Sequence, residues 1–195
     1  QIQSAGSGVS ALRLVGSSID HANQVDDIPE MDQRGSDIRP ESHGIVFDHV
    51  NFSYGSRPIL KDVSLTIPDR TTTAIVGPSG SGKTTLCNLI ARFWDVDGGR
   101  VTIGGRDVRE YTLESLMEQV SMVFQRVYLF ADTVENNIKF GCPGATHKQV
   151  VEAAKKACCH DFISALPDGY NTVIGEGGAT LSGGEKQRIS IARCL

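Results

Sequence analysis

The residues best suited to chemistry form a glycine-rich octapeptide in the first half of the chain. It reads Gly77-Pro78-Ser79-Gly80-Ser81-Gly82-Lys83-Thr84 and fits the pattern G-x-x-x-x-G-K-[ST] at every position. Glycines allow successive backbone N–H groups to turn inward around phosphate oxygens, and a side chain at Gly80 or Gly82 would crowd that approach. Lys83 supplies a full charge for the terminal phosphates, and the Thr84 hydroxyl is suited to ligate Mg²⁺, with Thr85 as a further contact. The pattern predicts a nucleoside triphosphate site; the alternative is a glycine-rich turn with an incidental lysine.

A second glycine-containing segment opens the last helix of the chain. It reads Leu181-Ser182-Gly183-Gly184-Glu185-Lys186-Gln187-Arg188. Ser182 and Glu185 have the spacing of a capping box, and Gly183 and Gly184 leave the first-turn N–H groups uncovered for an anion. Because one nucleotide needs only one phosphate cradle, two cradles suggest two copies of the chain that complete each other's sites. The alternative is a well-capped helix behind a glycine loop, which composition alone favours.

The segments before and after the octapeptide show the pattern of a strand–loop–helix unit. Residues 73–76 are an apolar run that we expect to be a strand, and Leu86, Leu89, Ile90 and Phe93 lie on one face of an expected helix. Further short alternating strands are expected at residues 45–47, 50–54, 63–67, 101–103 and 120–124. A strand, a loop, a helix and a return strand together form the unit of a parallel α/β sheet.

The second half of the chain is expected to be mostly helical. Capping-box spacing occurs at Ser115 with Glu118 and at Thr146 with Gln149. One longer helix is expected from Val150 to Leu166, ended by the Pro-Asp-Gly turn that follows. The N-terminal residues 1–43 are polar, with one short amphipathic helix around residues 9–19 and a linker at residues 26–42.

Composition excludes several other classes of protein. The 195 residues carry 19 Lys and Arg against 23 Asp and Glu, so the formal charge is 19 − 23 = −4, which argues against bulk binding of nucleic acid. No apolar run approaches the roughly 18 residues of a membrane-spanning helix. Five cysteines without a C-x-x-C pair argue against a disulfide framework or a zinc site and favour a reducing compartment.

The segment Leu181-Ser182-Gly183-Gly184 resembles the signature sequence of the ABC transporter ATPase domains, and the resemblance covers roughly residues 45–195. It implies a P-loop NTPase core of the α/β class, with an N-terminal antiparallel β subdomain and an inserted helical subdomain that carries the signature. It also implies that Gln125, after residues 120–124, links Mg²⁺ and the attacking water to the transport subunit. Tyr54 matches the aromatic residue that stacks on adenine in this family. Without the resemblance, Gln125 would be an ordinary strand-end residue and Tyr54 a half-buried strand aromatic.

Two further segments are similar to the exporter branch, in which the membrane helices precede the ATPase in one chain. The first runs from Phe124 to Phe130 and continues through residues 133–138, and the second is residues 173–178, just before the signature. An arginine often follows the glutamate in the second segment, whereas this chain has Gly177, which leaves the local contact with the membrane domain open. Residues 1–43 would then be the end of the last membrane helix and a linker, and residues 44–195 the ATP-binding domain.

The family's second acidic motif, with its catalytic glutamate, would follow the signature helix. The chain starts at Gln1 without Met and stops at Leu195 inside an expected helix, so we expect a fragment that lacks this motif and hydrolyses ATP poorly alone. The switch histidine would lie further on, and none of the five histidines has a matching context.

The sequence thus predicts an ATPase domain that couples Mg-ATP binding and hydrolysis to export across a membrane. Lys83 and Gln125 are the expected catalytic residues, and Thr84 and Gln125 the expected Mg²⁺ ligands. The expected nucleotide contacts are Tyr54, residues 77–85, Gln125, Ser182, Gly183, Gly184 and Glu185. The expected partners are a second ATP-binding domain and the membrane-spanning domain, at the cytoplasmic face of the membrane. Two alternatives stay open, a soluble ABC-type ATPase acting in DNA repair or translation, and a non-catalytic nucleotide-sensing module.

Overall fold

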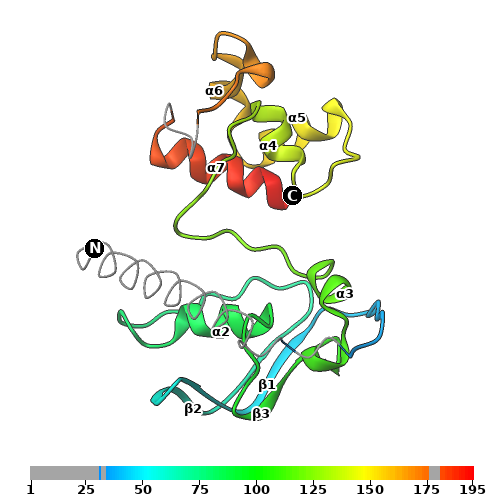
Figure 1. Ribbon diagram of the computed structural model, residues 1–195, viewed down its shortest axis with the longest axis vertical. Coiled ribbons are helices and arrows are strands. Elements are labelled where there is room, and N and C mark those ends of the chain that lie inside the picture. Colours follow the sequence, from blue (N-terminus) through cyan, green and yellow to red (C-terminus); the bar gives the residue numbers. More distant parts are fainter. Residues whose placement is uncertain (1–30, 32–33, 176–180) are drawn as a thin grey trace, which may run out of the picture. The chain divides into compact units, whose positions relative to one another are not determined.

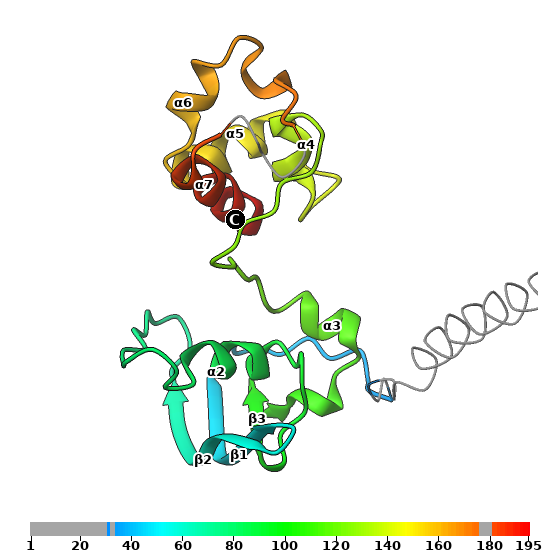
Figure 2. The ribbon, with the colours of Figure 1, turned by 60° about the vertical axis from the view of Figure 1, so that its left-hand side comes forward.

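The computed structural model describes residue 31 and residues 34–175 and 181–195. The chain divides into two compact units, one ending at Leu116 and the other formed by Met117–Leu195. The first unit contains the sheet and the second is helical, and both are drawn in Figures 1 and 2. The predicted amphipathic helix around residues 9–19 lies outside the described residues.

The first unit is built on a four-stranded antiparallel sheet in the order β2-β1-β3-β4. The strands are β1 (Ile45–Tyr54), β2 (Arg57–Ile67), β3 (Gly98–Ile103) and β4 (Arg106–Asp107). The expected short strands at residues 45–47 and 50–54 are one strand, and the polar break between them is a bulge in its pairing with β2 and β3. His49 at this bulge has a φ of 50°, and the regular alternation of side chains is interrupted there. One continuous strand therefore reads in the sequence as two short apolar runs.

Over its described residues the first unit also contains the helical segments α2 (Lys83–Ile90), the 3₁₀ turn η1 (Val108–Glu110) and α3 (Leu113–Met117). In both views α2 lies over one face of the sheet. Leu86 and Leu89 on α2 are buried together with Phe47, Phe52 and Val101 of the sheet. Burying the apolar face of this helix fixes the direction in which its N-terminal end points, and that end carries the glycine-rich loop.

The second unit is a group of short helices: α4 (Val134–Lys139), α5 (His147–Lys156), α6 (His160–Ser164), the 3₁₀ turn η2 (Gly169–Asn171) and α7 (Gly183–Cys194). Its core is apolar and includes Leu129, Val134, Val150, Ile163 and Ile189. A single antiparallel bridge joins Thr133 to Val173. α7 packs against α4 and α5, with Ile189 and Ala192 in the core, whereas Gly183 and Gly184 at its start are exposed.

Two predicted strands do not form. Residues 73–76 and 120–124 have no strand pairing among the described residues, and the strands that are described pair only antiparallel, so the expected parallel sheet is absent from this part of the chain. A strand is stable only when a neighbour satisfies its backbone N–H and C=O groups. Val76 is 87% exposed and Phe124 is 51% exposed, so the apolar runs have the residue types of buried strands but lack the neighbours.

The helix expected from Val150 to Leu166 is broken into α5 and α6. Cys158 between them has a φ of 56°, and the Cys159 amide turns back to donate to the Ala154 carbonyl at 2.8 Å. Cys159 and Ile163 are both completely buried after this turn, so α6 packs into the same core as α5. The apolar spacing was therefore correct for both helices, and only the break was missed.

The predicted capping boxes at Thr146 and at Ser115 have different outcomes. Thr146 accepts from the Gln149 amide, and the Gln149 side chain reaches back to the Thr146 backbone, so this predicted box is confirmed. Ser115 is not a cap: it lies buried within α3, and its amide donates to the Thr112 hydroxyl at 3.2 Å. The cap of this helix is three residues earlier than the sequence indicates.

Residues 34–42 of the expected linker lie along the first unit. The Ser36 amide donates to the Glu110 carbonyl at 2.8 Å, and the Thr112 amide donates to the Ser36 carbonyl at 3.0 Å. These bonds make a parallel bridge between Ser36 and Tyr111. The stretch before the sheet is thus hydrogen-bonded through Ser36 to residues 110 and 112 of the first unit.

Candidate nucleotide-binding site

The glycine-rich octapeptide forms a turn that ends directly in the first residue of α2. Gly82 is the N-cap of this helix, with a φ of 88° in the left-handed region. A Cβ built at Gly82 would lie 2.8 Å from the Leu60 Cδ2 atom, and Leu60 is a buried residue of β2. Gly82 is therefore required twice, by its backbone angle and by the side chain beneath it.

The open side of the loop is formed by the other glycine in the left-handed region. Gly80 has a φ of 81°, and a Cβ placed there would meet nothing within 4 Å. The first turn of α2 contains no acidic residue, so the positive end of the helix dipole is not neutralised within that turn. Thr84 is exposed on this turn, whereas Thr85 is 6% exposed. The loop fits a phosphate group that approaches the N-terminus of α2.

Lys83 folds its side chain back over the loop. Its ammonium group donates to the Gly77 carbonyl at 2.9 Å and to the Pro78 carbonyl at 2.8 Å, and lies 3.5 Å from the Ser81 hydroxyl. These acceptors are neutral, and no carboxylate pairs with the Lys83 ammonium group among the described residues. A phosphate oxygen offers a stronger, charge-assisted hydrogen bond from the same position.

Tyr54 is the last residue of β1 and belongs to an aromatic group with Phe52 and Trp94. Its ring centroid lies 4.9 Å from that of Phe52 and 5.1 Å from that of Trp94, with interplanar angles of 87° and 84°. Tyr54 is 37% exposed and Trp94 is 44% exposed, while Phe52 is buried. The exposed part of the Tyr54 ring is available to stack on a base, while two perpendicular rings hold the rest of it.

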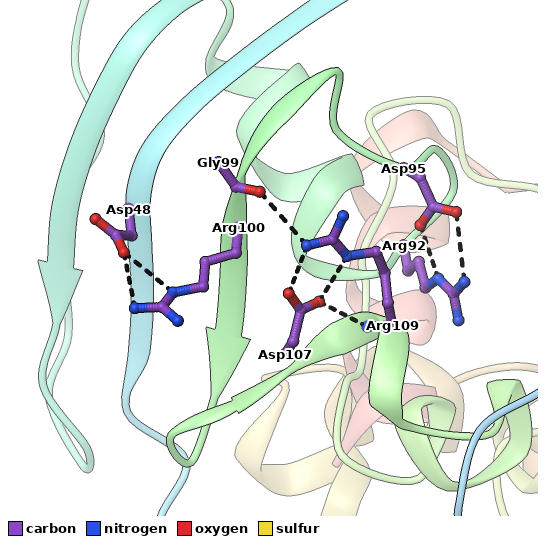
Figure 3. Close-up of polar contacts among 7 residues, drawn as sticks. All are labelled: Asp48, Arg92, Asp95, Gly99, Arg100, Asp107 and Arg109. Carbon is purple, nitrogen blue, oxygen red and sulfur yellow. Dashed lines mark hydrogen bonds and ion pairs between the residues drawn. The ribbon is translucent and has the colours of Figure 1, made fainter.

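Charged side chains fix the loop after α2 and the strands beside it (Figure 3). The Arg92 guanidinium is buried and bonded to Asp95, with Nε at 2.8 Å and Nη2 at 3.4 Å from the two carboxylate oxygens. Arg109 binds both oxygens of Asp107, at 3.0 and 2.6 Å, and also reaches the Gly99 carbonyl at 3.4 Å. Partial burial would raise the pKa of the Asp107 carboxyl, but the hydrogen bonds from Arg109 hold it below its ordinary value.

The signature segment begins α7 as the sequence predicts. The Ser182 hydroxyl accepts from the Glu185 amide, and the Glu185 carboxylate accepts from the Ser182 amide at 2.8 Å and from its hydroxyl at 2.7 Å. These bonds lower the pKa of Glu185, the side-chain bond with Ser182 most. The predicted capping box is confirmed.

The two glycines that follow Ser182 leave the start of α7 open. A Cβ at Gly183 would meet nothing within 4 Å, and one at Gly184 would meet only the Arg188 side chain at 3.8 Å. Nothing within the described residues therefore requires glycine at position 183. The exposed amides of this turn are suited to a ligand that approaches closely.

Gln125 lies in the second unit, in a segment without regular structure. It is exposed, as are its neighbours Phe124 and Arg126. The strand that was expected to end at Gln125 is absent from the described residues. The structure therefore places the octapeptide and Tyr54 in the first unit, and Gln125 and the signature in the second.

Two residues of interest were missed by the sequence analysis. Trp94, which contacts Tyr54, follows α2 without a motif of its own. Arg193 on α7 donates to the Asn137 carbonyl at 2.9 Å, the Asn137 amide oxygen at 3.1 Å and the Tyr128 carbonyl at 3.3 Å. A lone tryptophan or arginine carries no local signal, because its partners are distant in the sequence.

Neither a metal cluster nor a membrane span is found in the part of the chain that the structure describes. No group of three or more His, Cys, Asp or Glu residues there is arranged to hold a metal ion. No described helix has both the length and the apolar character needed to cross a bilayer. All five cysteines are free.

The family model described as ABC transporter matches residues 60–195, which include the octapeptide, Gln125 and the signature. The chain belongs to the ABC transporter family. This confirms the resemblance noted in the sequence and, with it, the P-loop ATPase fold.

Exporters are among the relatives that the chain matches. It is 45% identical over 188 residues to an ATP-dependent lipid A-core flippase of Desulfotalea psychrophila, covering 96% of this chain and 32% of the relative. It is 52% identical over 152 residues to the mitochondrial iron-sulfur clusters transporter ATM1 of Gibberella zeae, covering 77% of this chain and 22% of that protein. These matches favour the exporter branch over a soluble ABC-type ATPase.

A solved structure of a bacterial Atm1-family ABC exporter with ATP bound has the same fold. The TM-score is 0.85 at 41% sequence identity, over 90% of this chain and 32% of that one. The chain spans about a third of the length of these relatives or less.

Proposed function

We propose that this chain binds Mg-ATP and hydrolyses it to drive export of a substrate through a membrane-spanning domain. The observation that carries the proposal is the loop before α2, where Gly80 and Gly82 both have left-handed backbone and lead into an N-terminal turn without acidic residues. Lys83 lies over this loop, and no carboxylate of the described residues pairs with its ammonium group. The family match and the exporters among the relatives support the same function.

The nucleotide would be held at both of its ends by the first unit. Residues 77–85 would donate backbone N–H groups to the phosphates, while the exposed face of Tyr54 would stack on adenine. Lys83 would leave the Gly77 and Pro78 carbonyls and stabilise the charge that develops on the transferred phosphoryl group.

Mg²⁺ would be held by the Thr84 hydroxyl and by Gln125. Thr84 is exposed on the first turn of α2, and both side chains offer the oxygen ligands that this ion prefers. Mg²⁺ keeps several waters and phosphate oxygens, so few protein ligands are needed. When bound, the ion would neutralise charge on the phosphates, and Gln125 would relate its presence to the membrane-spanning domain.

A second ATP-binding domain would complete the site. Ser182, Gly183 and Gly184 of that domain would close over the terminal phosphate, and Glu185 would keep their turn in shape through the capping box. The open space at Gly183 supports this arrangement, because none of the described residues lies close enough to require glycine there. Closure with ATP and opening after hydrolysis would form a two-state switch that moves the membrane-spanning domain. The domain would lie at the cytoplasmic face of the membrane.

The test of nucleotide hydrolysis is Lys83→Ala in the full-length protein, followed by phosphate release. We expect the rate to fall by about 100-fold or more, since a charged group at the transferred phosphoryl is lost. Lys148→Ala on the exposed start of α5 is the matched control, with an unchanged rate expected. Equal rates for the two variants would refute the assignment.

The test of the shared site is Gly183→Asp, with Gly183→Asn as its control. A carboxylate in the first turn of α7 favours the helix dipole but repels a phosphate, so thermal stability should be kept while hydrolysis is lost. The asparagine variant has nearly the same size without the charge and should be less affected. Full hydrolysis by the aspartate variant would exclude an anion at this turn.

A further inference from the structure

The three rings of the aromatic group at the end of β1 are arranged in a defined geometry, although two of them are exposed. Phe52 is 3% exposed and acts as the base of the group, but Tyr54 and Trp94 are both more than one-third exposed. Burial alone therefore does not bring Trp94 to this place. Its ring stands nearly perpendicular to that of Tyr54, at 84° and 5.1 Å, which is the favoured geometry of an edge-to-face pair.

The backbone that carries Trp94 is tightly held. Arg92 has a φ of 51°, and the Phe93 amide donates back to the Asn88 carbonyl at 2.9 Å, which ends α2 in a sharp turn. The ion pair between Arg92 and Asp95 closes across Trp94, because its two residues lie on either side of that position in the sequence. The Arg92 side chain is 2% exposed and that of Asp95 is 38% exposed, so this ion pair reaches from the interior of the unit to its surface.

The same loop is tied to β1, the strand that ends in Tyr54. The Asp97 amide donates to the Asn51 carbonyl at 2.9 Å. Trp94 and Tyr54 are thus fixed to a common frame by backbone bonds on both sides. Tyr54 and Trp94 would not need these backbone hydrogen bonds if their side chains had no role beyond lying at the surface.

We propose that Trp94 is a positioning residue for recognition of the nucleotide base: its ring holds Tyr54 in the orientation that stacks on adenine. The proposal rests on the proposed function of Tyr54. A tyrosine at a strand end can turn about both of its side-chain torsions, and each free torsion weakens stacking because it must be ordered on binding. With Phe52 and Trp94 perpendicular to it, the Tyr54 ring is ordered before the base arrives.

One helix then serves both ends of the nucleotide. α2 begins at Lys83 beside the phosphate loop, and the turn after its last residue, Ile90, carries Trp94. A rigid helix between these two points keeps the distance between the phosphate-binding and base-binding groups constant. Base recognition therefore depends on a residue that the base itself need not touch.

The test compares two ligands on the full-length protein in the presence of Mg²⁺. Adenosine β,γ-imidotriphosphate contains the base and resists hydrolysis, whereas inorganic tripolyphosphate contains only the phosphates. Their affinities are measured by calorimetry for the parent protein and for Trp94→Leu, Trp94→Phe, Tyr54→Leu and the double variant with both leucines. Phe140→Leu, which removes an exposed aromatic of the second unit, is the control.

We expect Trp94→Leu to bind the nucleotide analogue about three- to tenfold more weakly and to bind tripolyphosphate as the parent does, since an edge-to-face pair is lost. Trp94→Phe should retain most of the affinity, and Phe140→Leu all of it. The double variant should be no weaker than Tyr54→Leu alone, because Trp94 acts through Tyr54.

Each other outcome overturns a defined part of this reasoning. A loss with Tyr54→Leu but none with Trp94→Leu rejects the role of Trp94 and leaves base stacking by Tyr54 intact. No loss with Tyr54→Leu rejects base stacking itself. Additive losses in the double variant mean that Trp94 contacts the base directly, and an equal loss of both ligands in Trp94→Leu means that it only supports the fold.

Discussion

Replacement of Arg193 by methionine is expected to loosen one side of the helical unit. Arg193 reaches from α7 to the backbone and side chain of Asn137 and to the Tyr128 carbonyl. Its guanidinium also lies 5.6 Å from the Phe130 ring centroid and 5.5 Å from that of Phe140. Burial lowers the pKa of Arg193, so the group is held by these contacts at a cost in hydration.

The size of the effect follows from these contacts. The two shorter hydrogen bonds, at 2.9 and 3.1 Å, contribute about 1 kcal/mol each. The two ring contacts contribute about 0.5 kcal/mol each. After subtraction of the cost of partly burying the guanidinium, we expect a net loss of about 2 kcal/mol. Methionine keeps a similar apolar stem, so the loss comes from the charged group rather than from a cavity.

Amide hydrogen exchange on the full-length protein measures this loss locally. The Phe130 amide donates to the Asn137 side chain at 2.9 Å, and that side chain loses its Arg193 partner in the variant. A loss of about 2 kcal/mol corresponds to roughly 30-fold faster exchange of the Phe130 amide.

Arg188→Met on the same helix is the matched control for Arg193→Met. The Arg188 guanidinium lies 5.1 Å from the Phe162 ring centroid, and its buried Nε has no hydrogen-bond partner within the part of the chain that the structure describes. We therefore expect less than a threefold effect, about 0.5 kcal/mol, on exchange near Phe162 and none at Phe130. If the Phe130 amide exchanges equally fast in both variants, the network around Arg193 does not stabilise the unit and the reasoning is wrong.

Three further predictions concern stability, each measured by thermal unfolding of the full-length protein. Gly82→Ala should cost about 2–4 kcal/mol, because its left-handed backbone and the close Leu60 side chain both oppose a Cβ, whereas Gly80→Ala, with open space, should cost only about 1 kcal/mol. Equal losses would show that the contact with Leu60 does not matter. Hydrogen bonds from Lys139 and then from His147 hold the pKa of Glu135 below its ordinary value of 4.5. The stability that the Glu135 carboxylate gives to the fold is therefore complete above that pH and is lost as the pH falls through the lowered pKa. Glu135→Gln should therefore lower the unfolding temperature at neutral pH and flatten its decline on acidification, and an unchanged decline would contradict this. Cys158→Gly should raise the unfolding temperature, since an exposed residue with a φ of 56° is relieved by about 0.5–1 kcal/mol, and a lower temperature would show that the side chain stabilises the turn.

The chemistry of the site could be predicted from short stretches of sequence. The structure of residues 77–84 depends on residues that are adjacent in the sequence, because a glycine turn that leads into a helix is a local structure. The same is true of the capping boxes at Thr146 and Ser182, where a side chain bonds to a backbone only three residues away. Local bonds of this kind leave a visible spacing in the sequence.

Strand pairing and broken helices could not be predicted in the same way. The apolar run at residues 73–76 has the composition of a strand, but strand formation depends on a neighbour, and none pairs with it among the described residues. The left-handed residue Cys158 splits one apolar periodicity into two helices. Cys159 and Ile163, four residues apart, would share a face of a continuous helix as well, so their spacing gives no sign of the break. Helical spacing reports which residues are buried and does not report where the axis changes direction.

The sequence by itself determined the glycine-rich loop before α2, the capped start of α7 and membership of the ABC transporter family, because these depend on residues that are close along the chain. Only the tertiary structure decided that Trp94 lies against Tyr54, 40 positions away, and that Arg193 holds Asn137. Such contacts depend on how β1, α2 and α7 pack, and packing joins residues without regard to their distance in sequence. The glycine-rich loop before α2 is thus predicted by a local motif, whereas the contact of Tyr54 with Trp94 depends on the tertiary fold.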